Sequence, residues 1–420
     1  MRISKLTGIA PDWLASYAGV ILLAGVFINL ATGFAQSTHS LTIPSMRVDL
    51  GISYIQAGLL VTLAGAVRMG ASLAAGTLAP RYGSRHLIGA GTVVTGLSML
   101  LLGYAPGFSV ALGASALMGL GSGVALTPMM GLVAPWFEMR NRGLAAGLTA
   151  AGGSIAIVAA GLVIPPLIDQ NPADGWRHTW YIFGGLVLVI GIMALLFLRD
   201  RPSDSSQSPG QPRSRAVHGA WPLTVYKNPH VWLLAYLGFC SGVAHGVFST
   251  FFGVYLIDEN GVSLNTAGQL LLLNGVLSVA SGILWGKVSD RLGRGRAFGL
   301  SFLIQGAGFE LFWLSPVLAS FVIASALFGL TLRAAFTLCA AASGDHVPAH
   351  FAAAAFALIS VGAGLGSTTS PILAGAIADT VGIGWVFPLG LGASLVGVAG
   401  SALLRTARTS PQPAAVAPGA

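Results

Sequence analysis

The sequence predicts an all-α integral membrane protein of twelve transmembrane helices, arranged as two six-helix bundles that repeat one another. The composition is 54% hydrophobic and only 8% charged over 420 residues, whereas a soluble domain carries roughly 25% charged residues. The hydrophobic residues fall into long apolar runs, and a run of about 18 or more residues reads as a membrane-spanning helix. The 58 glycines fit this class, because small residues let membrane helices approach closely.

The internal repeat is visible in two pairs of segments. Residues 76–85 and 286–296 share a rhythm of Gly, Arg, Gly and Arg between two apolar runs, and they begin 210 positions apart. Residues 114–120 (ASALMGL) return as residues 324–330 (ASALFGL), again 210 positions later. A single period in two unrelated segments indicates a duplicated unit.

Each half contains six apolar runs. In the first half, residues 1–198, we expect spans at 15–36, 54–79, 87–104, 108–133, 143–168 and 180–198. Residues 199–230 carry five prolines and a serine-rich run, which predicts a linker. In the second half, residues 231–404, we expect spans at 231–257, 266–288, 298–314, 318–341, 352–378 and 383–404, and then a disordered tail at 405–420.

The basic residues predict the orientation. Seventeen of the 21 Lys and Arg residues fall on one side of this map, and only Arg47 and Arg177 fall on the other. Because cytoplasmic loops carry the excess of positive charge, both termini, the linker and both basic turns are expected in the cytoplasm. Arg2 and Lys5 before the first run resemble a signal peptide, but its removal would break the repeat. We therefore expect an uncleaved multi-pass protein of the cytoplasmic (inner) membrane.

The second basic turn carries a recognisable motif. Gly286, Asp290, Arg291, Gly293, Arg294 and Arg296 match the pattern G-x-x-x-D-R-x-G-R-x-R. With twelve spans in a six-plus-six repeat, the chain resembles the major facilitator superfamily of secondary transporters. The resemblance implies that the aspartate caps a neighbouring helix N-terminus and pairs with basic residues, which holds one transport state closed.

The first basic turn keeps only part of this motif. Arg81, Gly83 and Arg85 are present, but Pro80 replaces the aspartate and Ser84 replaces a base. We therefore expect Asp290→Asn to impair cycling far more than any change at Pro80.

Two segments indicate which transporters of this superfamily the chain resembles. Residues 134–147 are similar to the turn before helix 5 in bacterial relatives of monocarboxylate and oxalate/formate carriers. Pro165 and Pro166 lack the adjoining glycines of the drug/proton antiporter motif, which makes export of a drug or neutral metabolite a weaker alternative.

Arg68 and Arg333 are the two basic residues near the middle of predicted spans. An arginine there costs about 2.5–3.5 kcal/mol on insertion scales, so it faces protein or a water-filled cavity. Glu310 is the only acidic residue inside a predicted span and lies near its end. Pairing with backbone carbonyls remains an alternative, but an unbalanced cationic cavity favours a small organic anion, a mono- or dicarboxylate.

Polar residues on other spans are further candidates for substrate binding. Asn29 and Gln36 lie on the first span, and Ser241, His245 and Ser249, spaced by four, share one face of the seventh. The resemblance implies that helices 1, 4, 7 and 10 line the cavity. Alternatively, the serines bond their own backbone and the amides join two helices.

The eighth span holds Asn274 and Ser278. Superfamily nitrate porters place their second arginine in that helix, so an inorganic anion remains an alternative substrate.

Glycine pairs predict where helices pack closely. The G-x-x-x-G and similar spacings involve Gly119, Gly121, Gly123, Gly143, Gly147, Gly362 and Gly366.

No residue pattern indicates an enzyme, a metal site or a cofactor. Cys240 and Cys339 both fall inside apolar runs, and the basic residues form no stripe that would bind nucleic acid. No carboxylate lies in the predicted spans 1, 4 or 7, which leaves a proton on His245, a proton carried with the weak acid, or exchange for a counter-anion as the coupling route. We expect a monomer; a non-transporting membrane sensor is the alternative from another class.

Overall fold

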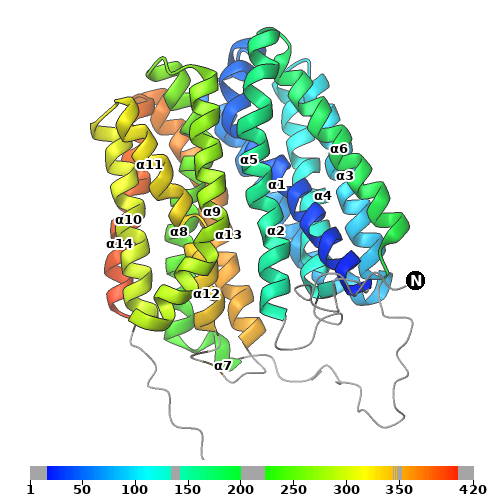
Figure 1. Ribbon diagram of the computed structural model, residues 1–420, viewed down its shortest axis with the longest axis vertical. Coiled ribbons are helices and arrows are strands. Elements are labelled where there is room, and N and C mark those ends of the chain that lie inside the picture. The colour runs from blue at the N-terminus through cyan, green and yellow to red at the C-terminus, as the bar shows by residue number, and fades with distance from the viewer. Residues whose placement is uncertain are drawn as a thin grey trace, which may run out of the picture.

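The computed structural model describes residues 17–133, 142–199, 223–343, 345, 347 and 352–404. Within this described part the chain is helical, and twelve helices are long and apolar enough to cross a membrane. Figure 1 shows two helical bundles standing side by side, with the first half in blue to green and the second in green to red. The predicted all-α membrane fold is confirmed.

The N-terminal half contains six helices. They are α1 (Tyr17–Leu50), α2 (Tyr54–Tyr82), α3 (Ser84–Tyr104), α4 (Phe108–Val133), α5 (Arg142–Gln170) and α6 (Gly175–Phe197). The C-terminal half begins with a short helix, and three of its spans are each made of two helical elements. Its elements are α7 (Leu223–Tyr226), α8 (Pro229–Val254), a π-helical turn (Tyr255–Glu259), α9 (Leu264–Leu292), α10 (Arg294–Leu314), α11 (Leu318–Thr331), α12 (Ala334–Ser343), α13 (Ala352–Thr380), a 3₁₀ turn (Ile383–Trp385) and α14 (Val386–Ala402).

The repeat of 210 residues is preserved in backbone conformation. Gly83 and Gly293 both have φ near +83°, and Gly51 and Gly261 have φ of +62° and +61°. Each pair lies 210 positions apart. Only glycine adopts such angles without strain, so the chain turns in the same way at the same place in each half.

The first helix is longer than predicted. It ends at Leu50 rather than near residue 36, and several hydroxyls of its polar stretch bond carbonyls of the same helix. The hydroxyls of Ser37, Thr38 and Thr42 donate to carbonyls one turn earlier, at 2.9, 2.7 and 2.9 Å. Polarity alone therefore did not mark the end of this span.

The prediction that Glu310 is the only acidic residue within a span is wrong. Longer helices take in further carboxylates, all close to helix ends: Asp49, Asp169, Asp290 and Asp379, with Asp258 and Glu259 in the π-helical turn. The tenth span is also not one helix, because it is interrupted between α11 and α12.

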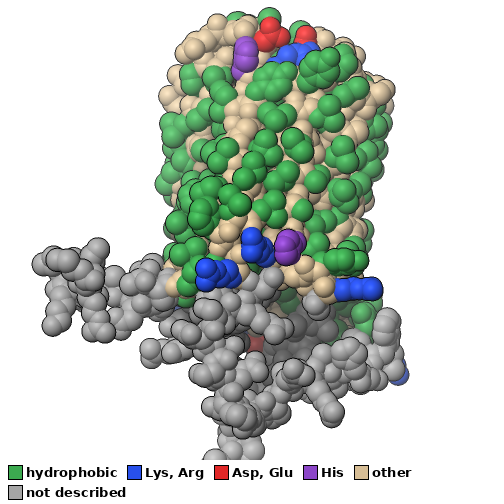
Figure 2. All heavy atoms as spheres, turned by 90° about the vertical axis from the view of Figure 1, so that its right-hand side faces the viewer, with side chains coloured by type: hydrophobic (Ala, Val, Ile, Leu, Met, Phe, Trp, Pro, Cys, Tyr) green, Lys and Arg blue, Asp and Glu red, His purple; other side chains and the backbone are tan. Residues whose placement is uncertain are grey.

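The two ends of the molecule differ in charge. We call the end that carries Tyr17, Leu404 and the turns at Gly83 and Gly293 the basic end, and the opposite end the far end. Figure 2 shows acidic side chains at the far end beside Lys or Arg and His side chains, further Lys and Arg side chains at the basic end, and a hydrophobic band between the two ends.

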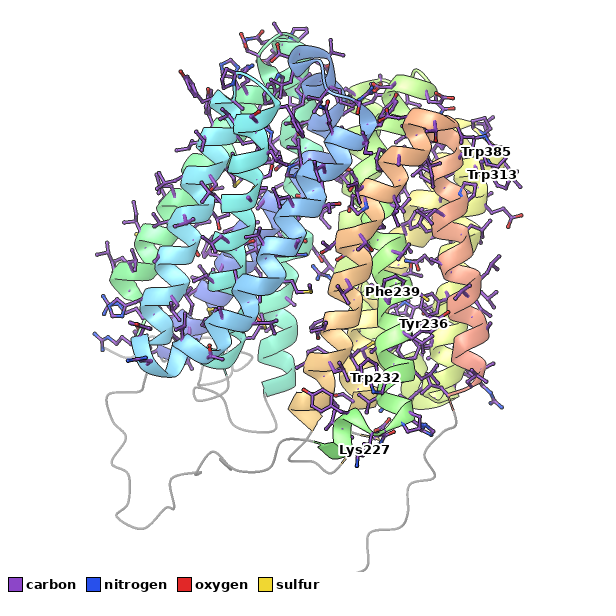
Figure 3. All side chains as sticks on the ribbon, turned by 180° about the vertical axis from the view of Figure 1, so that it is seen from behind. Lys227, Trp232, Tyr236, Phe239, Trp313 and Trp385 are labelled. Atoms are coloured by element: carbon purple, nitrogen blue, oxygen red, sulfur yellow. The ribbon has the colours of Figure 1, made fainter. Side chains whose placement is uncertain are left out.

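Aromatic side chains mark the two edges of the hydrophobic band. Trp313 and Trp385 lie together near the far end with ring centroids 5.5 Å apart, and Trp232 lies near Lys227 at the basic end (Figure 3). Tryptophan and lysine prefer the membrane interface, so these positions fit a chain that spans the bilayer.

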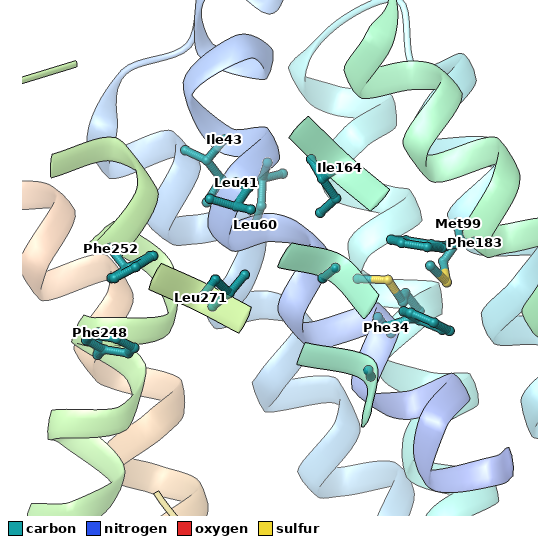
Figure 4. Close-up of a cluster of buried hydrophobic side chains, with 14 of the residues drawn as sticks. Phe34, Leu41, Ile43, Leu60, Met99, Ile164, Phe183, Phe248, Phe252 and Leu271 are labelled. Atoms are coloured by element: carbon teal, nitrogen blue, oxygen red, sulfur yellow. The ribbon is translucent and has the colours of Figure 1, made fainter. Parts of the chain in front are cut away.

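The hydrophobic core joins the two halves unevenly. One cluster of buried hydrophobic side chains includes residues of both halves. Leu41 and Ile43 of the N-terminal half and Phe252 and Leu271 of the C-terminal half belong to it (Figure 4). Around Trp285 and Leu338, the C-terminal half has a second cluster of its own. The halves are therefore packed together toward the far end.

Candidate functional site

Two polar links close the far end between the halves. Arg47 at the end of α1 forms an ion pair with Asp258 at 2.9 Å. The Asp379 carboxylate of α13 accepts hydrogen bonds from the backbone N–H groups of Tyr54 (3.0 Å) and Ile55 (2.8 Å). These are the first amides of α2, which have no partner within their own helix.

Glycines bring the backbones of the two halves together at the same end. Gly58 and Gly375 join α2 to α13, and Gly253 joins α8 to α1; a Cβ at any of them would collide with a carbonyl of the opposite half. Such contacts exclude water between helices.

On the basic-end side of these contacts, a cavity of about 520 Å³ lies between the two halves. All eight residues that the sequence singled out for substrate binding line it: Asn29, Gln36, Arg68, Ser241, His245, Ser249, Asn274 and Arg333. The lining continues toward the basic end along α12 and α13, to Cys339 and Phe356. Within the described residues, no Asp, Glu or Lys lines this cavity.

Arg333 stands in the interruption between α11 and α12. The break frees the carbonyl of Leu330, which accepts hydrogen bonds from Ser281 Oγ and Trp285 Nε1 of α9, both at 2.7 Å. The backbone N–H of Arg333 donates to Ser281 Oγ at 3.2 Å. Non-helical backbone at membrane depth is tolerated only where neighbours satisfy its polar groups or water reaches it, and here α9 satisfies them.

The guanidinium of Arg333 reaches across the cavity to the other half. Its Nη2 donates a long hydrogen bond of 3.5 Å to the carbonyl of Ala150 on α5. Gly153 leaves the space for it, because a Cβ there would lie 2.7 Å from the same nitrogen. With one weak bond for five N–H donors, most of the hydrogen-bonding capacity of the group is unused.

Arg68 has no hydrogen bond or ion pair to any residue that the structure describes. Its side chain lines the cavity and is half-buried. Its backbone carbonyl lies against Gly123 of α4, where a Cβ would clash. The close approach of α2 and α4 at this glycine fixes the point from which the arginine enters the cavity.

Ser241, His245 and Ser249 lie on one face of α8 as predicted. All three are partly exposed, whereas the residues between them are buried. The charged side chains that act electrostatically on the His245 ring are Arg333 and Arg68. The imidazole and both arginines therefore line the same cavity.

The amides are held by their own helices or neighbours. Asn29 and Gln36 donate to the carbonyls of Gly25 (2.9 Å) and Thr32 (3.3 Å) on α1. Asn274 donates weakly to Ser325 at 3.4 Å, which joins α9 to α11. Each keeps unused capacity toward the cavity.

Sequence reasoning missed His39, which also lines the cavity. Its ring packs edge-on against Trp180 at 4.8 Å, and its Nε2 has no partner among the described residues. It went unnoticed because it lies beyond residue 36, where the first span was expected to end.

Comparison with known proteins agrees with this architecture. The sequence matches the Major Facilitator Superfamily model over residues 25–278 and 234–419. The chain belongs to the Major Facilitator Superfamily. It is a multi-pass membrane protein, and the members it resembles are named mostly as transporters, with a membrane sensor protein of Escherichia coli, 26% identical over 70% of each chain, among them.

Three of the proteins most similar to this superfamily member are informative. A probable sulfoacetate transporter of Cupriavidus necator is 22% identical, covering 87% of this chain and 88% of the relative. A hexuronate transporter of Bacillus subtilis is 24% identical, and the match covers 64% of this chain and 63% of the relative. A bacterial homologue of the human lysosomal transporter Spinster, solved in an inward-facing state, shares the fold with a TM-score of 0.71 at 15% identity, covering 92% of this chain and 96% of that one.

The superfamily turn at Asp290 makes contacts only within its own half. Arg294 bonds Asp290 at 3.1 Å and Asp345 at 3.0 Å, and donates to Ser289 at 2.6 Å. Within the described chain, Asp290 has no contact across the halves. The role of the predicted lock therefore stays a prediction.

The first basic turn joins two helices of its own half. Arg85 donates two hydrogen bonds, of 2.8 and 2.6 Å, to the carbonyl of Leu195 in the last turn of α6. This pairing satisfies a helix C-terminus and joins α3 to α6. The backbone of Gly83 forms the turn between α2 and α3, while the surroundings of Pro80 lie outside the described part.

Most of the predicted glycine contacts are present. Gly119 packs on Ala64, Gly121 on Gly91, Gly123 on Arg68, Gly362 on Ala235 and Gly366 on Phe239, each against backbone atoms. Gly147 meets no described atom within 4 Å, so the structure does not support close packing there. The side-chain surroundings of Gly143 lie outside the described residues.

Proposed function

We propose that this protein is a secondary transporter that moves a small organic anion across the membrane by alternating access. The observation that carries the proposal is the pair Arg68 and Arg333 on one cavity whose described lining holds no acidic side chain. Two permanent cations without counter-charges are costly inside a membrane protein, and an anionic substrate would offset that cost.

The form of the cation favours a carboxylate or a sulfonate. A guanidinium presents a planar fork of donors that matches such groups with two parallel hydrogen bonds. A cavity of about 520 Å³ accommodates a small molecule, since ligand sites span roughly 300–1,000 Å³. The interrupted helix at Arg333 also supports this site, because transporters often bind substrate at discontinuous helices near the midplane.

The relatives support an organic anion. Two of the relatives are named as transporters of sulfoacetate and of hexuronates. Both substrates are organic anions. Nitrate or another inorganic anion stays an alternative that competition would test.

We place the basic end in the cytoplasm, following the distribution of Lys and Arg. The structure is then closed to the outside by the Arg47–Asp258 and Asp379–α2 links, with the cavity extending toward the cytoplasm. In the outward-facing state these links would open, and the turn at Asp290 would meet the other half.

Three coupling routes remain: a proton on His245, a proton carried with the substrate acid, or exchange for an internal anion. His245 lines the same cavity as the two arginines, where a substrate would meet it. An imposed pH gradient drives uptake in the first two cases, and strict need for an internal counter-anion identifies exchange.

Uptake by proteoliposomes tests the proposal. The purified chain is reconstituted and offered labelled carboxylates and sulfonates, each beside its neutral amide. We expect uptake of at least one anion and none of its amide, because the amide lacks the charge that both arginines require. Preferred uptake of the amides would contradict the proposal, and tight anion binding without uptake under any gradient would indicate a sensor.

A further inference from the structure

The two arginines occupy corresponding places in the repeat although they come from different helices. In the N-terminal half, Gly119 of α4 packs against the backbone of Ala64 on α2. Their counterparts 210 residues later, Gly329 of α11 and Asn274 of α9, pack in the same way.

One helical turn further along, each half places one arginine at this contact. Gly123 of α4 packs against Arg68 of α2. The counterpart of Gly123 is Arg333, which is bonded through its backbone N–H to Ser281 of α9. The arginine therefore comes from the second helix in one half and from the tenth in the other, at the same depth in the bundle.

This arrangement gives one cavity an arginine from each half. Arg68, Arg333 and His245 all line that cavity. Neither has a carboxylate partner among the described residues, so the lining of the cavity carries two positive charges. A monoanion would leave one of them uncompensated in a site of low dielectric.

We propose that the substrate is a short dianion with an acidic group at each end, one bound by Arg68 and the other by Arg333. The proposal rests on the anion transport argued above and narrows its substrate class. Such a ligand touches both halves at once, so its binding favours the state in which the halves have closed around it. A monoanion pairs with only one of the two arginines.

Isothermal titration of the purified full-length protein tests this directly. The probes are malonate, succinate and glutarate, compared with acetate, propionate and butyrate. We expect one dianion per chain and at least about 30-fold tighter binding for the best dianion than for the matching monoanion, the ratio that corresponds to the lower limit for truncating a buried charge pair.

Single-arginine variants show whether the preference comes from this pair. Arg68→Gln and Arg333→Gln should each reduce the dianion-to-monoanion ratio to near one. Lys227→Gln, which removes a positive charge from the basic end far from the cavity, should keep the wild-type ratio. Where a Gln variant does not fold, Arg68→Lys retains the charge and should preserve the preference at lower affinity.

Three results would overturn the inference: monoanions that bind as tightly as dianions, two monoanions bound per chain, or an unchanged ratio in Arg68→Gln. If monoanions bind as tightly as dianions and are taken up, the inference fails while anion transport stands. If no anion either binds or is taken up, both fail.

Discussion

The hydroxyl oxygen of Ser281 accepts a hydrogen bond from the backbone N–H of Arg333 at 3.2 Å. The same hydroxyl donates to the carbonyl of Leu330 at 2.7 Å. One serine on α9 thus satisfies both sides of the helix interruption from which Arg333 enters the cavity.

Ser281→Ala should therefore weaken anion binding as well as the fold. The change leaves the Arg333 N–H unsatisfied, which costs about 1–3 kcal/mol, while Trp285 still bonds Leu330. Thermal unfolding and ligand titration measure the two effects. Ser278→Ala is the control, because Ser278 bonds only its own helix at Gly275; equal behaviour of the two variants would refute the role of Ser281.

Gly153→Ala should displace the guanidinium of Arg333 without unfolding the protein. The added Cβ would lie 2.7 Å from Nη2, and the flexible side chain is the part that can move. A misplacement near 1 Å can cost about 10²-fold in activity, so we expect a loss of at least about 10-fold in uptake. Gly147→Ala, which meets no described atom within 4 Å, should behave as wild type. Wild-type uptake by Gly153→Ala would show that Arg333 does not need this position.

Asp379→Ala should favour opening of the far end. It removes the acceptor for Tyr54 and Ile55 at the start of α2, where loss of a cap costs about 0.5–2 kcal/mol. Asp169, its counterpart 210 residues earlier, has no hydrogen bond or ion pair among the described residues and provides the matched control. Spin-label distances between the halves at the far end should lengthen for Asp379→Ala only. The same lengthening in Asp169→Ala would show that the hydrogen bonds to Asp379 are not what holds the far end closed.

Asp290→Asn should slow transport while leaving thermal stability nearly unchanged. In this state Asp290 is 74% exposed and pairs only with Arg294 one turn away, and exposed pairs of this kind contribute roughly 0–1 kcal/mol. Its predicted action belongs to the state in which the basic end is closed. We expect a several-fold lower uptake rate, with a smaller effect from Pro80→Ala. Equal defects at both positions would argue against a lock specific to Asp290.

Composition, period and motif predicted the twelve spans, the repeat and the residues that line the cavity, because hydrophobic runs and rare charges report directly on membrane burial. The interruption at Arg333 was not predictable in this way. No proline or glycine marks residues 332–333, and the break depends on Ser281 and Trp285, which are distant in sequence. The hydrogen bonds between Asp379 and the start of α2 were not predictable for the same reason, since only folding brings α13 to the start of α2.

The initial rate of anion uptake by Arg333→Gln proteoliposomes tests the central claim most directly. Substitution keeps a polar side chain but shortens it and removes the charged fork, so loss of a buried pairing worth at least about 2 kcal/mol should reduce uptake about 30-fold or more. Lys227→Gln, reconstituted at the same density, should transport at the wild-type rate. Equal uptake by Arg333→Gln and Lys227→Gln would contradict the account.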